Sequence, residues 1–399
     1  MTRPDRSMSL APASILDYRE LARRRLPRQL FDYIDGGAYE ETTLRANVDD
    51  LTAVRLRQRV MRDVSELDLG TDVLGCKLAM PVVLAPVGLA GMFAARAEVQ
   101  AARAAESRGV VFCESTVSIA GIEEVAAATS QPFWYQLYVI RDRAYAEALM
   151  ARAAVAGSSV LVLTVDLPVV GARYRDTRNG MVGDIGVRAK AARALDLARH
   201  PRWVRDVAMG GKPLTFGNLE QAVPGAKNPQ SFKSWVDSQF DPSVTWSDLA
   251  WVREHWSGKV VVKGVIDAED ARIAVDHGVD GIVVSNHGGR QLDTVASSVS
   301  ALPAIVETVG DRTEVLVDGG IRSGLDVVKL LAMGARACLV GRAWAWAVAA
   351  SGGPGVEHVL DIVRGEMEVA MSLTGVTRVS ELSAEHLVTV QRSIDGGNS

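Results

Sequence analysis

Eight short runs of apolar, mostly β-branched residues recur along this chain, each followed by a polar or glycine turn and, in most cases, a helix-like segment. Continuous rather than alternating hydrophobicity is typical of strands that are covered on both faces. Segments such as AEVQAARAAESRG and DAEDARIAVDHG, which both end in glycine, indicate crossover helices between the runs. The runs occupy residues 80–88, 109–116, 133–139, 159–166, 259–265, 281–288, 313–320 and 337–343.

Eight strand-plus-helix units in sequence predict an α/β fold, the (β/α)8 TIM barrel. An open doubly wound sheet is the alternative, but it would favour a G-x-G-x-x-G fingerprint after the first strand, and none follows it here. The stretch between the fourth and fifth strands is too long for an ordinary connection, so it must contain an insertion. We therefore expect a helical N-terminal extension at 1–75, the barrel at 76–388 with the insertion at about 176–245, and a C-terminal tail at 389–399.

Composition excludes several classes of protein. A chain of 399 residues with 48% hydrophobic content can bury a large core, and a net charge of −4 argues against a nucleic-acid binder. Three scattered cysteines suit neither a disulfide framework nor a C-x-x-C metal site, so we expect no metal and a reducing compartment. No signal-peptide core or bilayer-length apolar run occurs, which predicts a cytoplasmic location.

Polar residues end every predicted strand. In a TIM barrel the active site lies at the carboxyl ends of the strands, so these residues are expected to converge. They are the APVG turn at 85–88, Ser115, Gln136 with Tyr138, Thr164 with Asp166, Lys263, His287 with Arg290, Asp318 with Arg322, and Gly341 with Arg342.

The turns after the last two strands suit a phosphate. DGGIRSGLD (318–326) and GRAW (341–344) place glycine amides and two arginines at predicted helix N-termini, where this fold commonly binds a phosphate group. The alternative is a pair of glycine-lined turns with solvent-exposed arginines. The pattern favours a phosphorylated ligand.

From about residue 17 to 388 the chain resembles the FMN-dependent L-2-hydroxy acid dehydrogenases and oxidases, and within that family the bacterial respiratory L-lactate dehydrogenases. The matching motifs are FDYIDGGA, LAPVG, WYQLYV, TVDLPVVGARYRD, VVKGV, SNHGGRQLD and DGGIRSGLDVVKLLAMGA. The resemblance implies FMN as cofactor and oxidation of L-lactate to pyruvate, with electrons passed to a membrane quinone. An oxidase or dehydrogenase of a bulkier L-2-hydroxy acid such as mandelate is the alternative.

The resemblance also implies roles for individual residues. His287 matches the active-site base and Asp166 its carboxylate partner, which is expected to raise the affinity of the imidazole for a proton. Arg173 and Arg290 match the two arginines that hold the substrate carboxylate. Tyr33 and Tyr138 match hydroxyls that contact the substrate.

The remaining matches concern the cofactor. Lys263 corresponds to a lysine near the flavin N1 and O2 atoms, where reduction places negative charge; the alternative is a strand-end lysine that reaches solvent. Gly88 stands where oxidases of the family tend to carry alanine, which favours a dehydrogenase. The expected cofactor-binding residues are Ala85, Pro86, Val87, Ser115, Gln136 and Thr164 around the ring, and Asp318, Gly319, Gly320, Arg322, Gly341 and Arg342 at the phosphate end.

One residue departs from the family pattern. Glu114 precedes Ser115, where the family commonly has an apolar residue. Alternation along the strand directs Glu114 away from Ser115, towards the helix layer. The sequence therefore predicts altered packing or an ion pair there, with flavin binding intact.

The insertion contains a basic segment at 187–213, and five of the eight tryptophans lie between Trp203 and Trp256. Such a composition favours contact with an anionic membrane surface, while a lid with its tryptophans packed on the barrel is the alternative. The tryptophans of SVTWSDLAWVREHW are expected to be core residues. The family resemblance also implies that the protein is peripherally bound to the inner face of the cell membrane and forms a homotetramer. The seven basic residues are Arg188, Lys190, Arg193, Arg199, Arg202, Arg205 and Lys212, against Asp196 and Asp206.

Two other functional classes are less consistent with the residues. A flavin-binding regulator without turnover would have little need for both Arg173 and Arg290. A barrel isomerase acting on a sugar phosphate would not need Lys263 and Gln136 around a flavin ring.

Overall fold

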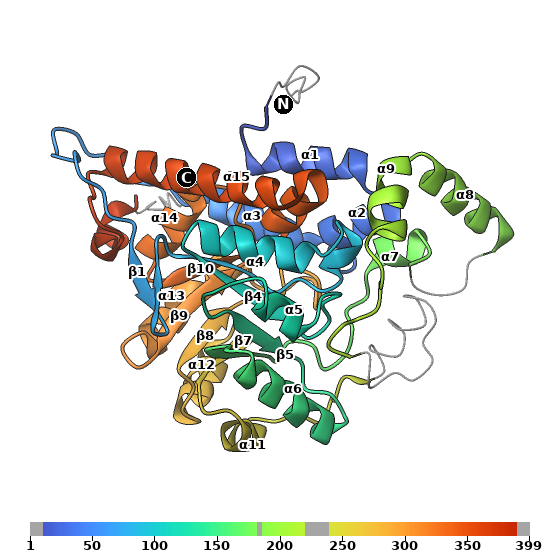
Figure 1. Cartoon of the computed structure of the whole chain (residues 1–399). Helices are drawn as coiled ribbons and strands as arrows, with labels where there is room; N and C mark the ends of the chain where they lie inside the picture. Colours follow the sequence, from blue (N-terminus) through green and yellow to red (C-terminus); the bar gives the residue numbers. More distant parts are fainter. Residues whose placement is uncertain (1–10, 182–185, 220–238, 389–399) are drawn as a thin grey trace, which may run out of the picture.

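A closed barrel of parallel strands forms the centre of the molecule in a computed structural model that describes residues 11–181, 186–219 and 239–388 (Figure 1). Its strands are hydrogen-bonded in the order β10-β3-β4-β5-β6-β7-β8-β9. The predicted TIM barrel is thus confirmed. The strands are β3 (Val82–Leu84), β4 (Val111–Ser115), β5 (Trp134–Leu137), β6 (Val160–Thr164), β7 (Lys259–Val265), β8 (Gly281–Val284), β9 (Glu314–Asp318) and β10 (Ala337–Val340).

Helices surround the barrel, as the glycine-terminated segments predicted. Side chains begin several of them: Asp142 caps α6 through the amide of Tyr145, and Asp267 caps α12 through the amide of Glu269. The long α15 consists of two helical segments that meet at Gly352, whose φ is +66°. The surrounding helices are α4 (Ala97–Ser107), α5 (Ile122–Ala126), α6 (Arg143–Val155), α11 (Asp248–His255), α12 (Ala268–Asp276), α13 (Ser298–Val309), α14 (Gly324–Ala332) and α15 (Arg342–Thr374).

Two apolar layers stabilise the barrel, one inside it and one beneath the helices. Successive residues of each strand point alternately into the two layers. Val83, Cys113, Val162 and Leu316 belong to the cluster that fills the barrel interior. Their neighbours, such as Phe112, face outward into the larger cluster beneath the helices. The next inward position after the apolar interior residues is therefore where each strand presents a side chain at the open end of the barrel.

The N-terminal extension contains α1 (Ile15–Arg25), α2 (Arg28–Asp35) and α3 (Thr42–Ala53). It ends in a hairpin of β1 (Thr71–Val73) and β2 (Cys76–Leu78), so the expected boundary between residues 75 and 76 falls inside this hairpin. Val73, Leu74 and Leu78 join the interior cluster and close the amino end of the barrel. Helix α1 lies alongside α15 (Figure 1).

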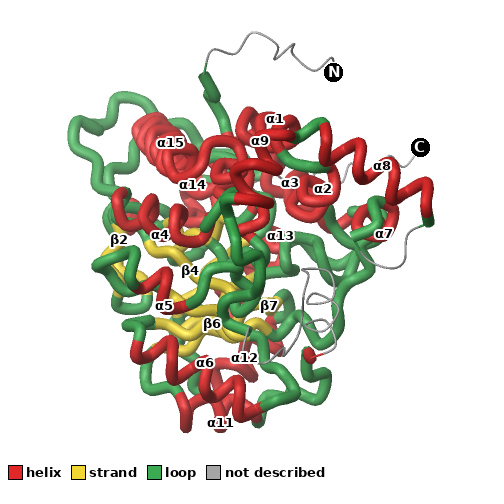
Figure 2. The backbone as a smooth tube through the Cα atoms, turned by 45° about the vertical axis from the view of Figure 1, so that its right-hand side comes forward, coloured by secondary structure: helices red, strands yellow, loops and turns green. Residues whose placement is uncertain are grey.

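The insertion projects from the side of the barrel (Figure 2). Its described part contains α7 (Tyr174–Arg178), α8 (Val187–Ala198), α9 (Pro201–Trp203) and a π-helical turn (Val204–Met209). Short 3-10 turns occur elsewhere, at Ala90–Met92, Val379–Glu381 and Ala384–His386. The parts of the predicted insertion at 182–185 and 220–238, and the predicted tail at 389–399, lie outside the described residues.

Candidate active site

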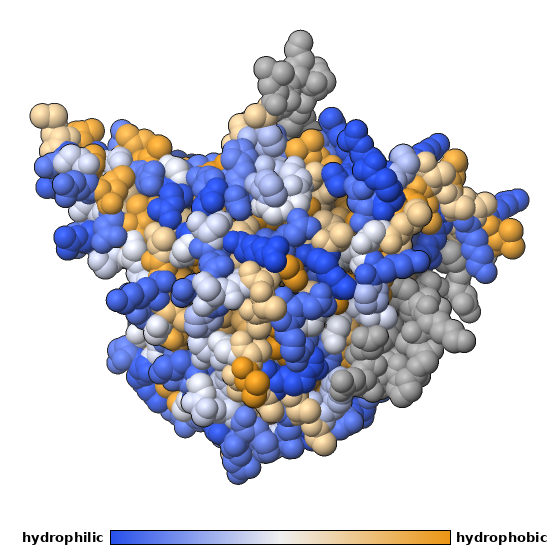
Figure 3. All heavy atoms as spheres, in the orientation of Figure 1, coloured by the Kyte–Doolittle hydropathy of each residue, from blue (hydrophilic) through white to orange (hydrophobic). Residues whose placement is uncertain are grey.

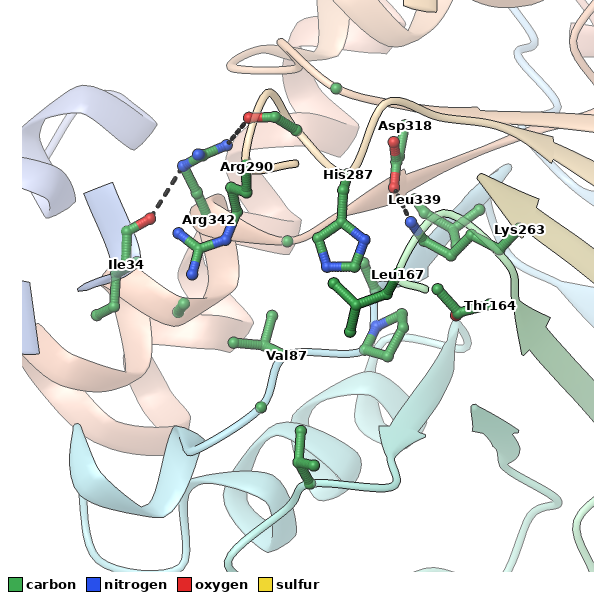
Figure 4. Close-up of a pocket in the computed structure, with 18 of the residues that line it drawn as sticks. Ile34, Val87, Thr164, Leu167, Lys263, His287, Arg290, Asp318, Leu339 and Arg342 are labelled. Carbon is green, nitrogen blue, oxygen red and sulfur yellow. Dashed lines mark hydrogen bonds and ion pairs between the residues drawn. The ribbon is translucent and has the colours of Figure 1, made fainter. Parts of the chain in front are cut away.

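One pocket at the open end of the barrel brings most of the predicted residues together (Figure 4). All of them line it except Ser115, Gln136 and Asp166. These three lie directly behind its wall: Ser115 Oγ donates to Gln136 Oε1 over 3.0 Å, and Asp166 accepts from His287. The lining residues from the predicted set are Tyr33, Ala85, Pro86, Val87, Tyr138, Thr164, Arg173, Lys263, His287, Arg290, Asp318, Gly319, Gly320, Arg322, Gly341 and Arg342.

His287 is held from two sides. Its Nδ1 lies 2.8 Å from Asp166 Oδ1, and its backbone N–H donates to Ser285 Oγ over 3.1 Å. Because burial and the positive charges of Lys263 and Arg173 outweigh Asp166, the pKa of His287 is lowered from its ordinary value of 6.5. Asp166 itself raises the pKa of His287, as the pairing predicts, but its effect does not offset burial and the two nearby cations.

The pKa of Asp166 stays below its ordinary value: burial opposes ionisation, but the interactions with His287, including their hydrogen bond, and the positive charge of Lys263 outweigh it. An ionised carboxylate accepts a hydrogen bond, so Nδ1 carries the proton of a neutral imidazole. Its Nε2 then has a free lone pair. A neutral histidine with a free nitrogen is equipped to take up a proton.

Two guanidinium groups lie against the ring of Tyr33. The Cζ atoms of Arg173 and Arg290 are 5.7 and 4.8 Å from the ring centroid. Arg290 also donates to the carbonyl of Gly36 over 3.1 Å. Burial and the nearby charge of Arg173 lower the pKa of Arg290 to about 10. These two positive charges repel each other in one wall of the pocket, and a bound anion would offset that repulsion.

Lys263 is buried and paired, so the alternative of a lysine that reaches solvent is wrong. Its Nζ lies 2.8 Å from Asp318 Oδ2 and donates to Ser285 Oγ over 2.9 Å. Burial favours the neutral amine, but Asp318 and Asp166 outweigh it and raise the pKa of Lys263. The pocket therefore contains a fixed cation next to the His287 pair (Figure 4).

The two arginines after β9 and β10 also face the pocket and are partly buried, which rules out the alternative of solvent-exposed arginines. Arg342 donates to the carbonyls of Ile34 and Gly36, over 2.9 and 2.8 Å. Within the described part of the chain, no carboxylate pairs with Arg322 or Arg342. Burial lowers the pKa of Arg322 to about 10 and that of Arg342 well below its ordinary value.

Several buried polar atoms around the pocket have no partner among the described residues. Besides one carboxylate oxygen each of Asp166 and Asp318, they include Thr164 Oγ1 in the pocket wall and Gln136 Nε2 behind it. An unsatisfied buried polar group is costly, so such atoms suit a ligand that carries hydrogen-bonding atoms of its own. With the unpaired arginines at the other end, the pocket fits a polar aromatic ring joined to a phosphate.

Comparison with known proteins agrees with this fit. The family model described as FMN-dependent dehydrogenase matches residues 22–389. The chain belongs to the FMN-dependent dehydrogenase family. Its cofactor is FMN, and the unpaired polar atoms and arginines described above fit that cofactor.

Relatives within the FMN-dependent dehydrogenase family cover nearly the whole chain. An L-lactate dehydrogenase of Caulobacter vibrioides (strain NA1000 / CB15N) is 56% identical over 371 residues, 93% of this chain and 96% of the relative. An L-lactate dehydrogenase of Alcaligenes faecalis is 51% identical over 376 residues, 94% of this chain and 98% of the relative.

Solved structures show the same fold. Monotopic membrane protein (S)-mandelate dehydrogenase superposes with a TM-score of 0.88 at 35% identity, covering 94% of this chain and 99% of that one. A mandelate oxidase superposes with a TM-score of 0.80 at 37% identity, covering 95% and 98%.

Sequence reasoning missed several residues of the site. Phe216 and Phe240 line the pocket, and the ring of Phe240 lies 5.2 Å from that of Tyr138. Both belong to the insertion, where no motif marked them. Ser285 also went unnoticed, although it stands first in SNHGGRQLD and contacts both Lys263 and His287.

Glu114 lies in the outward layer, and of the two predicted alternatives, altered packing or an ion pair, the described residues form no ion pair with it. It accepts a hydrogen bond from Asn218 Nδ2 over 3.1 Å. Burial raises the pKa of Glu114 well above its ordinary value and so favours the neutral form of the side chain. Asn218 also accepts from the amide of Ile122 over 2.8 Å, so this pair joins the insertion to β4 and α5.

Proposed function

We propose that this chain oxidises L-lactate to pyruvate with FMN as cofactor and passes the electrons to a membrane quinone. The observation that carries the proposal is the placement of a histidine paired with a carboxylate, two arginines and a buried lysine in the walls of one pocket. The L-lactate dehydrogenases that are 51–56% identical to the chain support the choice of substrate.

The substrate carboxylate is assigned to Arg173 and Arg290. Guanidinium groups hold both oxygens of a carboxylate, and an anion here offsets the repulsion between the two cations. Tyr33 and Tyr138 are assigned to the substrate oxygens. Because burial and the charge of Asp166 raise the pKa of Tyr138, its hydroxyl stays protonated and can donate a hydrogen bond.

The proton is assigned to His287. Its Nε2 accepts a proton from the substrate during oxidation at C2, and Asp166 stabilises the imidazolium that forms. When bound, FMN supplies the two-electron acceptor for this oxidation. Lys263 keeps its positive charge through Asp318 and stabilises negative charge that develops on the reduced ring.

The residues assigned to the cofactor divide by their position in the pocket. Ala85, Pro86, Val87 and Thr164 in the pocket wall, with Ser115 and Gln136 behind it, are assigned to the ring, and Gly319, Gly320, Arg322, Gly341 and Arg342 to the phosphate. We assigned Asp318 to cofactor binding from the sequence; its ion pair suggests that it acts through Lys263.

Contact with a membrane is assigned to the insertion. Helix α8 has no buried residue, and the side chains of Val187 and Leu195 are exposed among its basic residues. Figure 3 shows apolar and charged residues interspersed on this projecting part. The N-terminal extension contacts the insertion at two points: Asp196 of α8 accepts from the amide of Arg28, and Asp206 of the π-helical turn pairs with Arg25. Such a surface suits anionic lipid.

The described tryptophans of this region pack on the barrel and do not face the surface assigned to the membrane. Trp203 is buried, and its Nε1 donates to the carbonyl of Met92 over 2.8 Å, so it anchors the insertion to the barrel rather than facing lipid. Trp256 is buried, and Trp246 and Trp251 pack against the core, in line with their expected core position. None of the described helices is long and apolar enough to span a bilayer.

Two observations bear on the oxidant and the substrate. A methyl group added at Gly88 would lie 2.6 Å from Val117 Cγ2, so the alanine typical of oxidases would require Val117 to move. The aromatic wall of Phe216, Phe240 and Tyr138 favours the second candidate, a bulkier acid such as mandelate. The solved mandelate enzymes support that candidate at lower identity.

The experiment measures steady-state kcat/KM for L-lactate, glycolate and (S)-mandelate, each with oxygen and with a soluble quinone analogue. We expect lactate with the quinone analogue to give the highest value. A higher kcat/KM for mandelate would replace lactate as the substrate, and equal rates with oxygen would reject the quinone assignment.

Sedimentation with anionic and neutral vesicles tests the membrane assignment, and light scattering tests the homotetramer that the family resemblance suggests. Binding only to anionic vesicles is expected for the basic α8.

A further inference from the structure

A reciprocal pair of amide side chains joins the N-terminal extension to the loop that carries His287. Asn47 Nδ2 donates to Asn286 Oδ1, and Asn286 Nδ2 donates to Asn47 Oδ1, both over 2.8 Å. Asn47 is 2% exposed and Asn286 is 5% exposed. The partners are 239 residues apart in sequence, and Asn286 immediately precedes His287.

Helix α3, which carries Asn47, is enclosed by loops from the open end of the barrel. At its amino end, Asp293 accepts from the amide of Thr43 over 2.7 Å. A Cβ atom added to Gly320 would lie 2.0 Å from the Asn47 carbonyl, so the loop after β9 leaves no space beside the helix. The helix also packs against α13 and α14, near which it lies in Figure 2. This enclosure gives Asn47 a rigid support.

The backbone at His287 needs such support. Its φ is +58°, a left-handed conformation that is unfavourable for a residue with a Cβ atom. Asn286 Oδ1 also accepts from the amide of Gly289 over 3.0 Å, which closes the turn around His287. Asn286 Nδ2 is further fixed by the carbonyl of Ala296, over 3.1 Å.

We propose that Asn47 is a positioning residue for the reaction: through its reciprocal amide pair with Asn286 it holds His287 in the conformation that meets Asp166 and the pocket. The proposal rests on the assigned role of His287 as the base. It gives the N-terminal extension a part in catalysis, because one of its helices orients the base from outside the barrel.

Loss of Asn47 has two expected effects. The amide of Asn286 is left buried with fewer partners, so the turn around His287 relaxes towards ordinary backbone angles. The imidazole then moves relative to Asp166 and to the substrate, and a displacement of about 1 Å reduces a rate by about 100-fold. The pocket arginines are untouched, so substrate binding persists.

The test compares Asn47→Ala, Asn286→Ala, the double variant and His287→Gln with a matched control, Leu51→Ala. Leu51 is buried on the same helix, so its truncation destabilises α3 without touching Asn286. FMN content, melting temperature, the rate of anaerobic flavin reduction by lactate, and the pH profile of kcat/KM are measured on the holoenzymes.

We expect Asn47→Ala to retain FMN and its KM for lactate while flavin reduction slows by about 10- to 100-fold. Because Asp166 raises the pKa of His287, loosening their contact shifts the acidic limb of the pH profile to lower pH. The double variant is expected to lose no more than Asn286→Ala alone, since Asn47 acts on His287 only through Asn286, which also holds Gly289 and Ala296. Leu51→Ala is expected to melt at a lower temperature with the wild-type reduction rate and pH profile.

Wild-type reduction by Asn47→Ala, or the same loss in Leu51→Ala, would overturn the proposal, as would additive losses in the double variant. His287→Gln distinguishes failure of the base role of His287 from failure of the positioning role of Asn47. If it reduces flavin normally, the assigned base is wrong; if it is inactive while Asn47→Ala is not slowed, only the positioning role fails.

Discussion

His287 and Asp166, which are 121 residues apart in sequence, are joined by a 2.8 Å hydrogen bond between Nδ1 and Oδ1. The bond connects the loop after β8 to the loop after β6, across the intervening strand β7. Lys263 on β7 stands behind both residues, and its charge contributes to the lowered pKa of His287. The base is therefore neutral, oriented and close to a fixed cation.

His287→Gln tests the base directly. Glutamine preserves polarity and approximate size, so we expect the purified variant to keep its yellow colour. Flavin bleaching by lactate under anaerobic conditions should be nearly abolished, because the amide does not accept a proton at neutral pH. His277→Gln, at an exposed position after α12, is the matched control and should bleach like the wild type. Normal bleaching by His287→Gln would remove this histidine from its assigned role.

The pH dependence follows from the lowered pKa of His287. A base works only when unprotonated, so kcat/KM should fall as the pH drops through the pKa of the free enzyme. Since burial, Lys263 and Arg173 place that pKa below 6.5, kcat/KM should already be level at neutral pH. Initial rates at low lactate concentration, measured across the acidic range, give the inflection. An inflection above 6.5 would contradict the electrostatic account of the pocket.

Lys263 and Asp318 can be separated by a double variant. Lys263→Met leaves the carboxylate of Asp318 buried without its cation, which typically costs about 3–5 kcal/mol of folding stability. Lys263→Met/Asp318→Asn should recover much of the melting temperature but not the flavin reduction potential, since both variants lack the cation that stabilises the reduced ring. Equilibration with reference dyes measures the potential. A wild-type potential in either variant would contradict the role given to Lys263.

Arg322 should distinguish FMN from riboflavin, which lacks the phosphate. Its described side-chain contacts are a hydrogen bond to the carbonyl of its neighbour Ile321 and a cation–π contact with the Trp346 ring, 4.8 Å away, against which the methionine of Arg322→Met can still pack. Loss of a hydrogen bond to a charged group, about 1.5–3 kcal/mol, predicts about 10- to 100-fold weaker binding of FMN to the apoprotein with riboflavin affinity unchanged. Arg336→Met, at an exposed position near the amino end of the barrel, is the control. Equal losses for both flavins would place the phosphate elsewhere.

Glu114→Gln should reveal a stability that depends on pH. The pKa of Glu114 is raised in the folded protein, so above the ordinary value of 4.5 the unfolded chain releases this proton first. Folding stability of the wild type therefore falls as the pH rises from 4.5 towards the folded pKa. Glutamine still accepts the hydrogen bond from Asn218 and has no proton to lose.

The glutamine variant should consequently melt at a higher temperature than the wild type at pH 8, with a smaller difference near pH 5. Melting temperatures measured across this range are the readout. A difference that does not change with pH would show that Glu114 is not held neutral by burial.

Much of the barrel and its rim was predictable because strand alternation is local information. Val162 and Thr164 are two residues apart on β6, so one fills the barrel interior and the other reaches its open end. The same alternation placed Glu114 in the outward layer correctly. The hydrogen-bond partner of Glu114 was not predictable. Asn218 lies 104 residues later in the chain, within the insertion, and no sequence pattern links it to Glu114.

The sequence predicted which residues form the site better than it predicted their pKa values. From the sequence, Asp166 alone suggested a more basic His287, but the pKa depends on every charge and on the solvent excluded around it. Lys263 and Arg173 approach from other segments and lower this pKa together with burial, and the three effects outweigh Asp166.

The sequence by itself determined the number of strands in the barrel, the residues at their ends and the family, because each of these depends on short segments whose periodicity and order can be read along the chain. Only the tertiary structure decided which residues face one another. Asn47 meets Asn286, Lys263 meets Asp318, and the net pKa of His287 falls, because closure of the barrel brings distant segments together and excludes water from the space between them.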